Sequence, residues 1–214
     1  MGGTASPGGA LKGGPAVTAL PTDDGSRHLR FSHDVAFGLT VALARSDALA
    51  FVRDAGRSLR RADFLEELSV ACGPPPTVSA QLPVHAAPFG ARRLPFTSEI
   101  VRTAEGARLV AGPPPTPGSG WAEVGGEAWV TAGEAGPSRL DYRLTVTVTL
   151  ALPAAERWGM RALLKMVELA GAAVLRRVVE SLPSAVEAAA LEEVAAVDVA
   201  AAHAVAPPTL EPGA

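Results

Sequence analysis

Residues 139–182 constrain the fold more than any other stretch, because a long alternating segment is followed directly by a long amphipathic one. Apolar side chains occupy every second position from Leu140 to Leu152, with charged residues or threonine between most of them. This period of two is typical of a strand with one buried face. From Pro153 onward apolar residues recur at helical spacing, which predicts a helix that Pro183 ends after Leu182. A helix with this apolar stripe needs an apolar partner, and the preceding strand supplies one.

The part of the chain before residue 139 predicts six more strands and two short helices. Apolar residues alternate over 28–40, which indicates the first strand. Ser46 and Asp47 suit the start of a short helix that Gly56 ends, and a second short helix is expected over 58–64. The remaining strands are expected at 67–72, 78–84, 94–100, 107–111 and 121–131. Together with the long strand, this makes an α+β fold of about seven strands.

The two ends of the chain differ from its middle. Residues 1–26 are rich in Gly, Ala and Pro and have no period, so we expect a flexible leader. Residues 183–214 are rich in alanine, and Ser184 and Glu187 have the spacing of a capping box, so this tail is expected to be partly helical. One domain over 27–182 remains between them.

Composition argues against several classes of function. A net charge of -3 over 214 residues gives no reason to expect nucleic-acid binding. Cys72 has no partner for a disulfide, and the four histidines lack metal-ligand spacing, so we expect neither metal nor cofactor. Charges interrupt the helix at 153–182 too often for an integral membrane segment. No signal peptide is evident, so we expect a cytoplasmic protein.

The order of these elements resembles the START-like, or SRPBCC, superfamily, also called the helix-grip fold. The resemblance rests on the long strand leading into the long helix at 139–182 and on the first strand followed by a short helix at 28–54. It covers residues 28–182 and suggests a bacterial branch of the superfamily. It implies a curved antiparallel sheet that grips one long C-terminal helix and encloses a mostly apolar cavity. Members bind lipids, sterols, polyketides, hormones or quinones, and some are cyclases or hydratases.

The superfamily has no shared catalytic motif, so the candidate site is a set of residues expected on the inner face of the sheet and helix. His33 and Tyr142 lie in the inward stripes of their strands, where each could contact a ligand or pack in the core with its polar atoms satisfied. Ser98 shares a face with Phe96 and has the same two interpretations. The predicted cavity lining is His33, Phe37, Phe96, Ser98, Tyr142, Leu144, Leu163, Val167 and Ala170. The small residues Ala170 and Gly171 are expected to leave room between the helix and the sheet.

Three functions remain open from the sequence. The first is non-catalytic binding of a small apolar molecule, such as a lipid, a polyketide or a quinone-like compound. The second is a cyclase or hydratase reaction that uses His33 or Tyr142 as acid or base. The third is a protein-interaction module with a closed core, in which residues 183–204 bind a partner or a second copy of the chain. A cavity of several hundred Å³ would favour the first over the third, since ligand sites usually span roughly 300–1,000 Å³.

Overall fold

The computed structural model describes residues 16–21, 27–86, 90–113, 120–132, 137–151 and 160–205. The strands of this part form one antiparallel sheet in the order β1-β2-β8-β7-β6-β5-β4-β3. Their bounds are β1 Ala16–Pro21, β2 Arg27–Val41, β3 Glu66–Ala71, β4 Thr77–Ala86, β5 Gly90–Arg102, β6 Gly106–Ala111, β7 Gly120–Ala132 and β8 Ser138–Ala151. Strands β2 to β8 correspond one for one to the seven predicted strands. The predicted α+β fold class is therefore confirmed.

Strand β1 lies within the segment that was predicted to be a flexible leader. It pairs with β2 in antiparallel register, from Ala16 opposite Ser32 to Pro21 opposite Arg27. Without β1, this part of β2 would be a sheet edge with unpaired backbone groups. Backbone hydrogen bonds need no apolar period, so the periodicity of the sequence did not reveal this strand. The domain boundaries drawn at residues 27 and 182 stay predictions.

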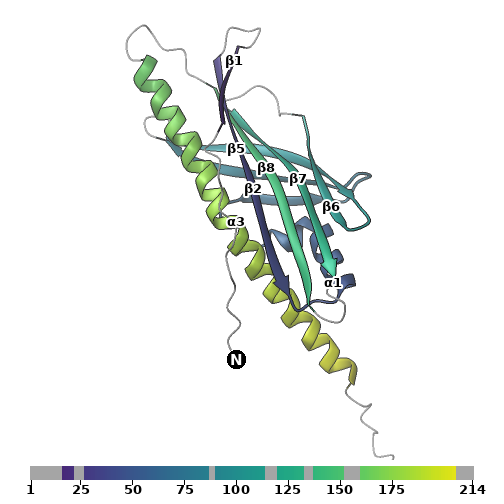
Figure 1. Ribbon diagram of the computed structural model, residues 1–214. Helices are drawn as coiled ribbons and strands as arrows, with labels where there is room; N and C mark the ends of the chain where they lie inside the picture. Colours follow the sequence, from purple (N-terminus) through teal and green to yellow (C-terminus); the bar gives the residue numbers. More distant parts are fainter. Residues whose placement is uncertain are drawn as a thin grey trace, which may run out of the picture.

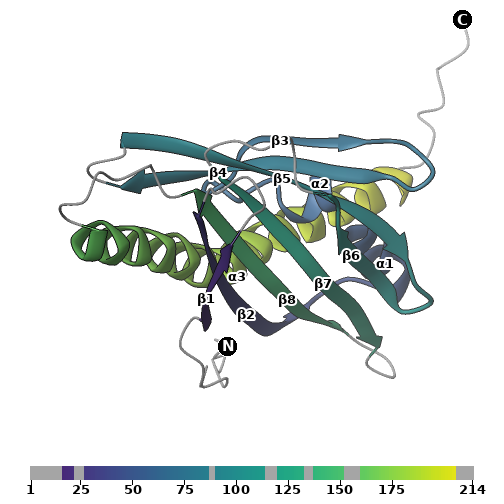
Figure 2. The same ribbon diagram turned by 90° about the horizontal axis from the view of Figure 1, so that it is seen from above.

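The sheet curves around the long helix α3, Met160–Val205. This helix contacts β2 and β8 on one side and β4 on the other. In a flat sheet, the five strand spacings between β2 and β4 would separate them by about 24 Å, whereas a helix is only about 10–12 Å wide. Curvature of the sheet brings both groups of strands to the helix. In Figure 2, β3, β4 and β5 run along the helix, and β2, β8 and β7 cross it obliquely.

The prediction that Pro183 ends the helix is wrong, because α3 continues through this residue without a break. A proline inside a helix costs about 3 kcal/mol, since it lacks an N–H and its ring crowds the preceding turn. Packing offsets this cost: buried residues continue on both sides of Pro183, at Leu182, Ala185 and Val186. Figure 1 shows α3 as one long helix beside β2, which it contacts. The predicted helix start at Pro153 lies outside the described residues.

Two short helices follow β2, as predicted, but the second lies elsewhere than expected. Helix α1, Arg45–Arg53, agrees with the prediction. Helix α2, Ala55–Ser58, precedes the expected range of 58–64 and contains Gly56, which was expected to end α1. Asp54 caps α2, since its Oδ1 accepts a hydrogen bond of 3.1 Å from the backbone N–H of Arg57. Helix α1 contacts β6 and β7, and α2 contacts α3.

Within the described ranges, no helix combines the length and the apolar character that crossing a membrane requires.

Candidate functional site

A cavity of about 80 Å³ lies between the inner face of the sheet, α1, α2 and α3. Its wall is apolar except for Ser58, Glu127 and Tyr142. The lining residues are Val52, Ala55, Ser58, Leu59, Phe64, Leu65, Val78, Leu82, Phe96, Ile100, Ala107, Leu109, Val124, Glu127, Ala128, Tyr142, Leu144, Val146, Val178, Leu182 and Val186. We call it the central cavity.

Small residues on β6, β7 and α2 leave this space unfilled. On the inner face of β7, Val124 and Ala128 flank Gly126, which has a φ of 141°. A Cβ at Gly126 would collide with the backbone of Arg143 and Leu144 on β8, so no larger residue fits there. Ala107 of β6 and Ala55 of α2 add little bulk to the lining. The curved sheet and the helices α1, α2 and α3 therefore leave this space unfilled.

Tyr142 is the lining residue with the most unusual environment. The residue is only 7% exposed, and its hydroxyl oxygen has no hydrogen-bond partner among the described residues. Its ring stacks on that of Phe37, with centroids 4.8 Å apart and planes inclined by 6°. Burial raises the pKa of the Tyr142 hydroxyl well above its ordinary value. The group therefore stays protonated at neutral pH and can donate a hydrogen bond that no described protein atom accepts.

Two other polar residues near the central cavity, Ser98 and Glu127, already have partners. Ser98 is fully buried, and its hydroxyl donates a hydrogen bond of 2.6 Å to the carbonyl oxygen of Val124. The Glu127 carboxylate lies 3.5 Å from Nη2 of Arg108, and both side chains are largely exposed. Its charge is therefore solvated outside the apolar space. Ser58 also lines the cavity, but among the described lining residues Tyr142 is the one whose fully buried side-chain oxygen has no hydrogen-bond partner.

The structure brings three of the nine predicted lining residues together around the central cavity: Phe96, Tyr142 and Leu144. His33, half-buried on β2, is not among the lining residues, and Phe37 reaches the site only through its contact with Tyr142. Ser98, Val167 and Ala170 are buried in the core instead. The side chain of Leu163 lies outside the described residues. Whether any of the nine binds a ligand stays a prediction.

The helical wall of the cavity lies further along α3 than the sequence indicated. Ala170 and Gly171 were expected to leave space, but Gly171 faces the ring of Phe31, which fills it. The lining residues of α3 are Val178, Leu182 and Val186, two of them within the predicted helix and one beyond Pro183. The apolar spacing of these three residues was visible in the sequence. The prediction that the helix ends at Pro183 excluded Val186 from the helical wall of the cavity.

An arginine–glutamate cluster holds the second half of α3 against the segment that contains α2. Arg57 Nη1 lies 3.4 Å from Glu193 Oε1, and Arg60 Nε lies 3.1 Å from Glu192 Oε2. Arg60 Nη2 also donates a hydrogen bond of 2.9 Å to the carbonyl oxygen of Ala189, and Arg61 pairs with Glu192. The three arginines follow or flank the lining residues Ser58 and Leu59, so this cluster fixes one wall of the cavity.

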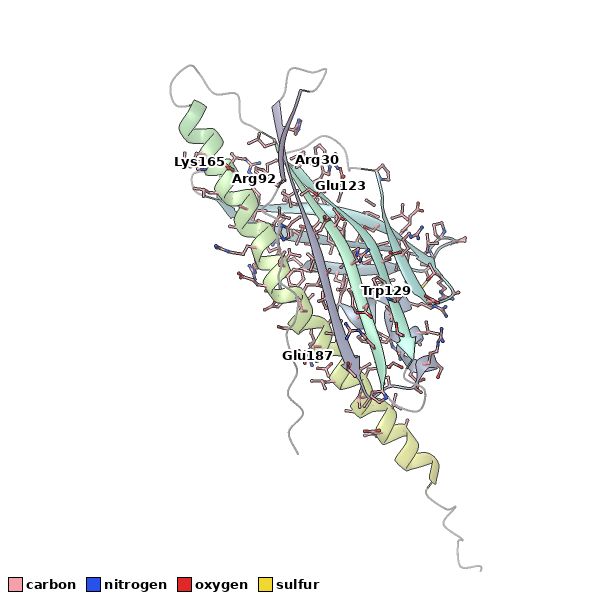
Figure 3. The ribbon with its side chains drawn as sticks, viewed as in Figure 1. Arg30, Arg92, Glu123, Trp129, Lys165 and Glu187 are labelled. Carbon is pink, nitrogen blue, oxygen red and sulfur yellow. The ribbon has the colours of Figure 1, made fainter. Side chains whose placement is uncertain are left out.

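Other charged residues lie on the outer face of the sheet, away from the cavity. Arg30 Nη2 forms an ion pair of 2.7 Å with Glu123 Oε2, and these two residues lie close together in Figure 3. The guanidinium of Arg143 lies over the ring of Trp129, 5.9 Å from its centroid. Across the part of the chain that the structure describes, no group of His, Cys, Asp or Glu is arranged to hold a metal ion.

The sequence matches one family model, which is described as protein of unknown function (DUF3809), over residues 36–180. The chain belongs to the DUF3809 family. The match runs from β2 to the middle of α3, so every strand that lines the cavity lies within the family's region. A search of curated proteins gave no significant match.

Several solved structures are similar to this DUF3809 protein at low identity. TTHA0849 from Thermus thermophilus is 15% identical with a TM-score of 0.43, over 75% of this chain and 98% of that one. The di-domain aromatase/cyclase StfQ of the steffimycin biosynthetic pathway is 18% identical with a TM-score of 0.44, over 74% of this chain and 50% of that one. The Zhui aromatase/cyclase from Streptomyces sp. R1128 is 19% identical with a TM-score of 0.39, over 74% and 93%. Likeness at this level carries no activity over to this chain.

Proposed function

We propose that this DUF3809 protein binds a small apolar molecule in the central cavity, as a non-catalytic binder of the START-like type. The observation that carries the proposal is the cavity itself, an almost wholly apolar space that neither the sheet nor the helices fill. Apolar surface that faces an empty space forgoes its dispersion contacts, and an apolar ligand restores them. The grip of the sheet on α3 supports the superfamily assignment.

The volume of the cavity limits the ligand. About 80 Å³ is well below the roughly 300–1,000 Å³ of ordinary ligand sites, so the volume alone does not favour ligand binding over an interaction module with a closed core. A lipid or a polyketide with several rings exceeds it, so such a ligand requires the wall formed by α3 and α2 to move outward. A compact molecule of a few heavy atoms needs a much smaller adjustment. We therefore propose a compact ligand rather than a long acyl chain.

A cyclase or hydratase reaction is the second candidate, because Tyr142 lines the cavity and its buried hydroxyl keeps its proton at neutral pH. A protonated phenol in an apolar site can donate a proton or a hydrogen bond to a carbonyl oxygen. It is poorly suited to act as a base, and His33, the other predicted acid or base, is not a lining residue. Turnover of a cyclisable polyketone that Tyr142→Phe abolishes would favour this candidate over non-catalytic binding.

The test of the proposed function uses two apolar probes of different size, xenon and benzene, measured by NMR on the full-length protein. We expect both to bind to the wild type. Ala128→Leu adds three carbon atoms to a residue that lines the cavity, so it should abolish binding at little cost in stability. The matched control is Ala122→Leu, on the inner face of the same strand but outside the lining.

Ala122 is only 3% exposed and packs in the core, so its replacement by leucine should destabilise the protein by about 1–3 kcal/mol without filling the cavity. The proposal is overturned if xenon and benzene fail to bind to the wild type, or if Ala128→Leu binds them equally well. Native mass spectrometry of freshly purified protein provides a second readout, in which a bound small molecule should appear on the wild type and be missing from Ala128→Leu.

A further inference from the structure

We infer that the ligand of the central cavity is a neutral molecule whose carbonyl oxygen accepts a hydrogen bond from the Tyr142 hydroxyl. This inference rests on the proposed function and names the class of its ligand. Its basis is the one buried side-chain polar group in the described lining that lacks any hydrogen-bond partner.

The position of the Tyr142 hydroxyl is determined by its surroundings. Phe37 stacks against the ring of Tyr142. In the sheet, Tyr142 is paired with Ala128 on β7 and with Phe37 on β2. A tyrosine hydroxyl lies on the axis of its ring, so a fixed ring fixes the oxygen. Tyr142 therefore holds a hydrogen-bond donor at one point of a wall that is apolar apart from Ser58 and Glu127. A site with one oriented polar group distinguishes ligands by whether they can satisfy that group.

A ligand with a carbonyl group should bind more tightly than a hydrocarbon, because the Tyr142 hydroxyl lacks a hydrogen-bond partner among the described residues. A buried hydroxyl without a partner has lost its hydrogen bonds to water and gained none from the protein. A ligand that offers an acceptor restores one bond, whereas a hydrocarbon of the same shape leaves the hydroxyl unsatisfied. A tyrosine hydroxyl is protonated at neutral pH, and burial raises the pKa of Tyr142 further, so it has a proton to donate to an acceptor on the ligand. The discrimination should be about tenfold or more, which is typical of a hydrogen bond to a buried polar group.

The rest of the lining indicates that the ligand is uncharged. It contains no Lys, Arg or His, and its single carboxylate, that of Glu127, is paired with Arg108 at the surface. The arginines of the arginine–glutamate cluster are not lining residues, and they form ion pairs with Glu192 and Glu193. An anionic headgroup in this space would be stripped of water without a cation to pair with, which is very costly. A neutral ketone or aldehyde meets no such penalty.

The experiment compares two probes of nearly equal shape, cyclohexanone and methylenecyclohexane, which differ in a C=O and a C=CH₂ group. Their dissociation constants are measured by NMR titration on the full-length wild type and on Tyr142→Phe. We expect Tyr142→Phe to raise the dissociation constant of cyclohexanone about tenfold or more. The dissociation constant of methylenecyclohexane should stay the same or fall slightly. The matched control is Ser138→Ala, which removes a buried hydroxyl that is bonded to the Leu43 carbonyl oxygen and lies outside the lining.

The outcomes separate this inference from the proposed function. If the wild type binds neither probe, the proposed function fails. If it binds both and Tyr142→Phe changes them by the same factor, or if Ser138→Ala reproduces the selective loss, the cavity binds apolar molecules but the inference about Tyr142 is wrong. Tyr142→Phe is expected to fold, since the hydroxyl that it removes has no partner among the described residues.

Discussion

Gly171→Ala tests the close contact between α3 and β2, where two effects of known size oppose each other. Alanine is the better helix former by about 1 kcal/mol, so at an open position the substitution would stabilise the protein. At Gly171, however, the new Cβ would lie 2.6 Å from Cδ2 and 2.8 Å from Cε2 of Phe31. Ordinary carbon contacts are at least about 3.5 Å, so the ring or the helix must move by about 0.9 Å.

Phe31 has no room for that movement, because it is completely buried. Overpacking of this kind costs about 1–3 kcal/mol, which equals or exceeds the gain in helix propensity. We therefore expect Gly171→Ala to lower the free energy of unfolding by as much as about 2 kcal/mol. Urea denaturation followed by circular dichroism measures this change, and an unaltered m-value indicates that the compactness of the unfolded state is unaltered.

The matched control is Ala173→Gly, at an exposed position of the same helix, which measures the propensity difference alone. In a Phe31→Leu background, Gly171→Ala should cost less than it does in the wild type, since the smaller side chain makes room for the methyl group. The reasoning is refuted if Gly171→Ala stabilises the protein by the amount that Ala173→Gly destabilises it, because the contact with Phe31 would then be absent.

Three further predictions concern other parts of the structure. Pro183→Ala should raise the free energy of unfolding by about 1–3 kcal/mol in urea denaturation, because α3 continues through this position; a loss would contradict the continuous helix. Glu193→Gln should lower the free energy of unfolding by about 1 kcal/mol, since the Glu193 carboxylate pairs with Arg57 and Arg60. Glu187→Gln, at an exposed position, should change the free energy of unfolding little. Equal effects of the two substitutions would argue against the arginine–glutamate cluster. Above pH 10, the wild type should lose stability relative to Tyr142→Phe by up to about 1.4 kcal/mol per pH unit. The reason is that unfolded Tyr142 releases its proton near its ordinary pKa of 10.0, whereas the folded residue retains it. The difference in unfolding free energy between the two proteins is measured by urea denaturation at about pH 9, 10 and 11, and a constant difference would contradict a raised pKa.

Most of the sheet was predictable because its strands carry their own signal. In β8, residues on one face such as Leu140 and Leu144 are buried, whereas Arg139 before them and Arg143 between them are exposed, as the alternation required. Strand β1 and helix α2 carried no such signal. Backbone pairing with β2 stabilises the first, and the Asp54 side chain caps the second. Neither interaction imposes a period on the sequence.

The candidate site was only partly predictable, for a different reason. Inward positions could be recognised from periodicity, and Phe96, Tyr142 and Leu144 were identified in this way. Periodicity does not say how far an inward side chain reaches or what lies opposite to it. Ala170 and Gly171 looked like free space, yet Phe31 from β2 occupies it. Val186 looked like part of a separate tail, yet it lines the cavity.

The sequence by itself determined the fold class, the seven strands β2 to β8 and the amphipathic character of the helix after them, because alternation and helical spacing are local properties of the chain. Tertiary structure alone decided that α3 continues through Pro183, that the space lies near Ala128 rather than near Gly171, and that the Tyr142 hydroxyl lacks a partner among the described residues. Those outcomes depend on which side chains meet across the curved sheet, and residues far apart in the sequence supply the atoms that fill or leave each space.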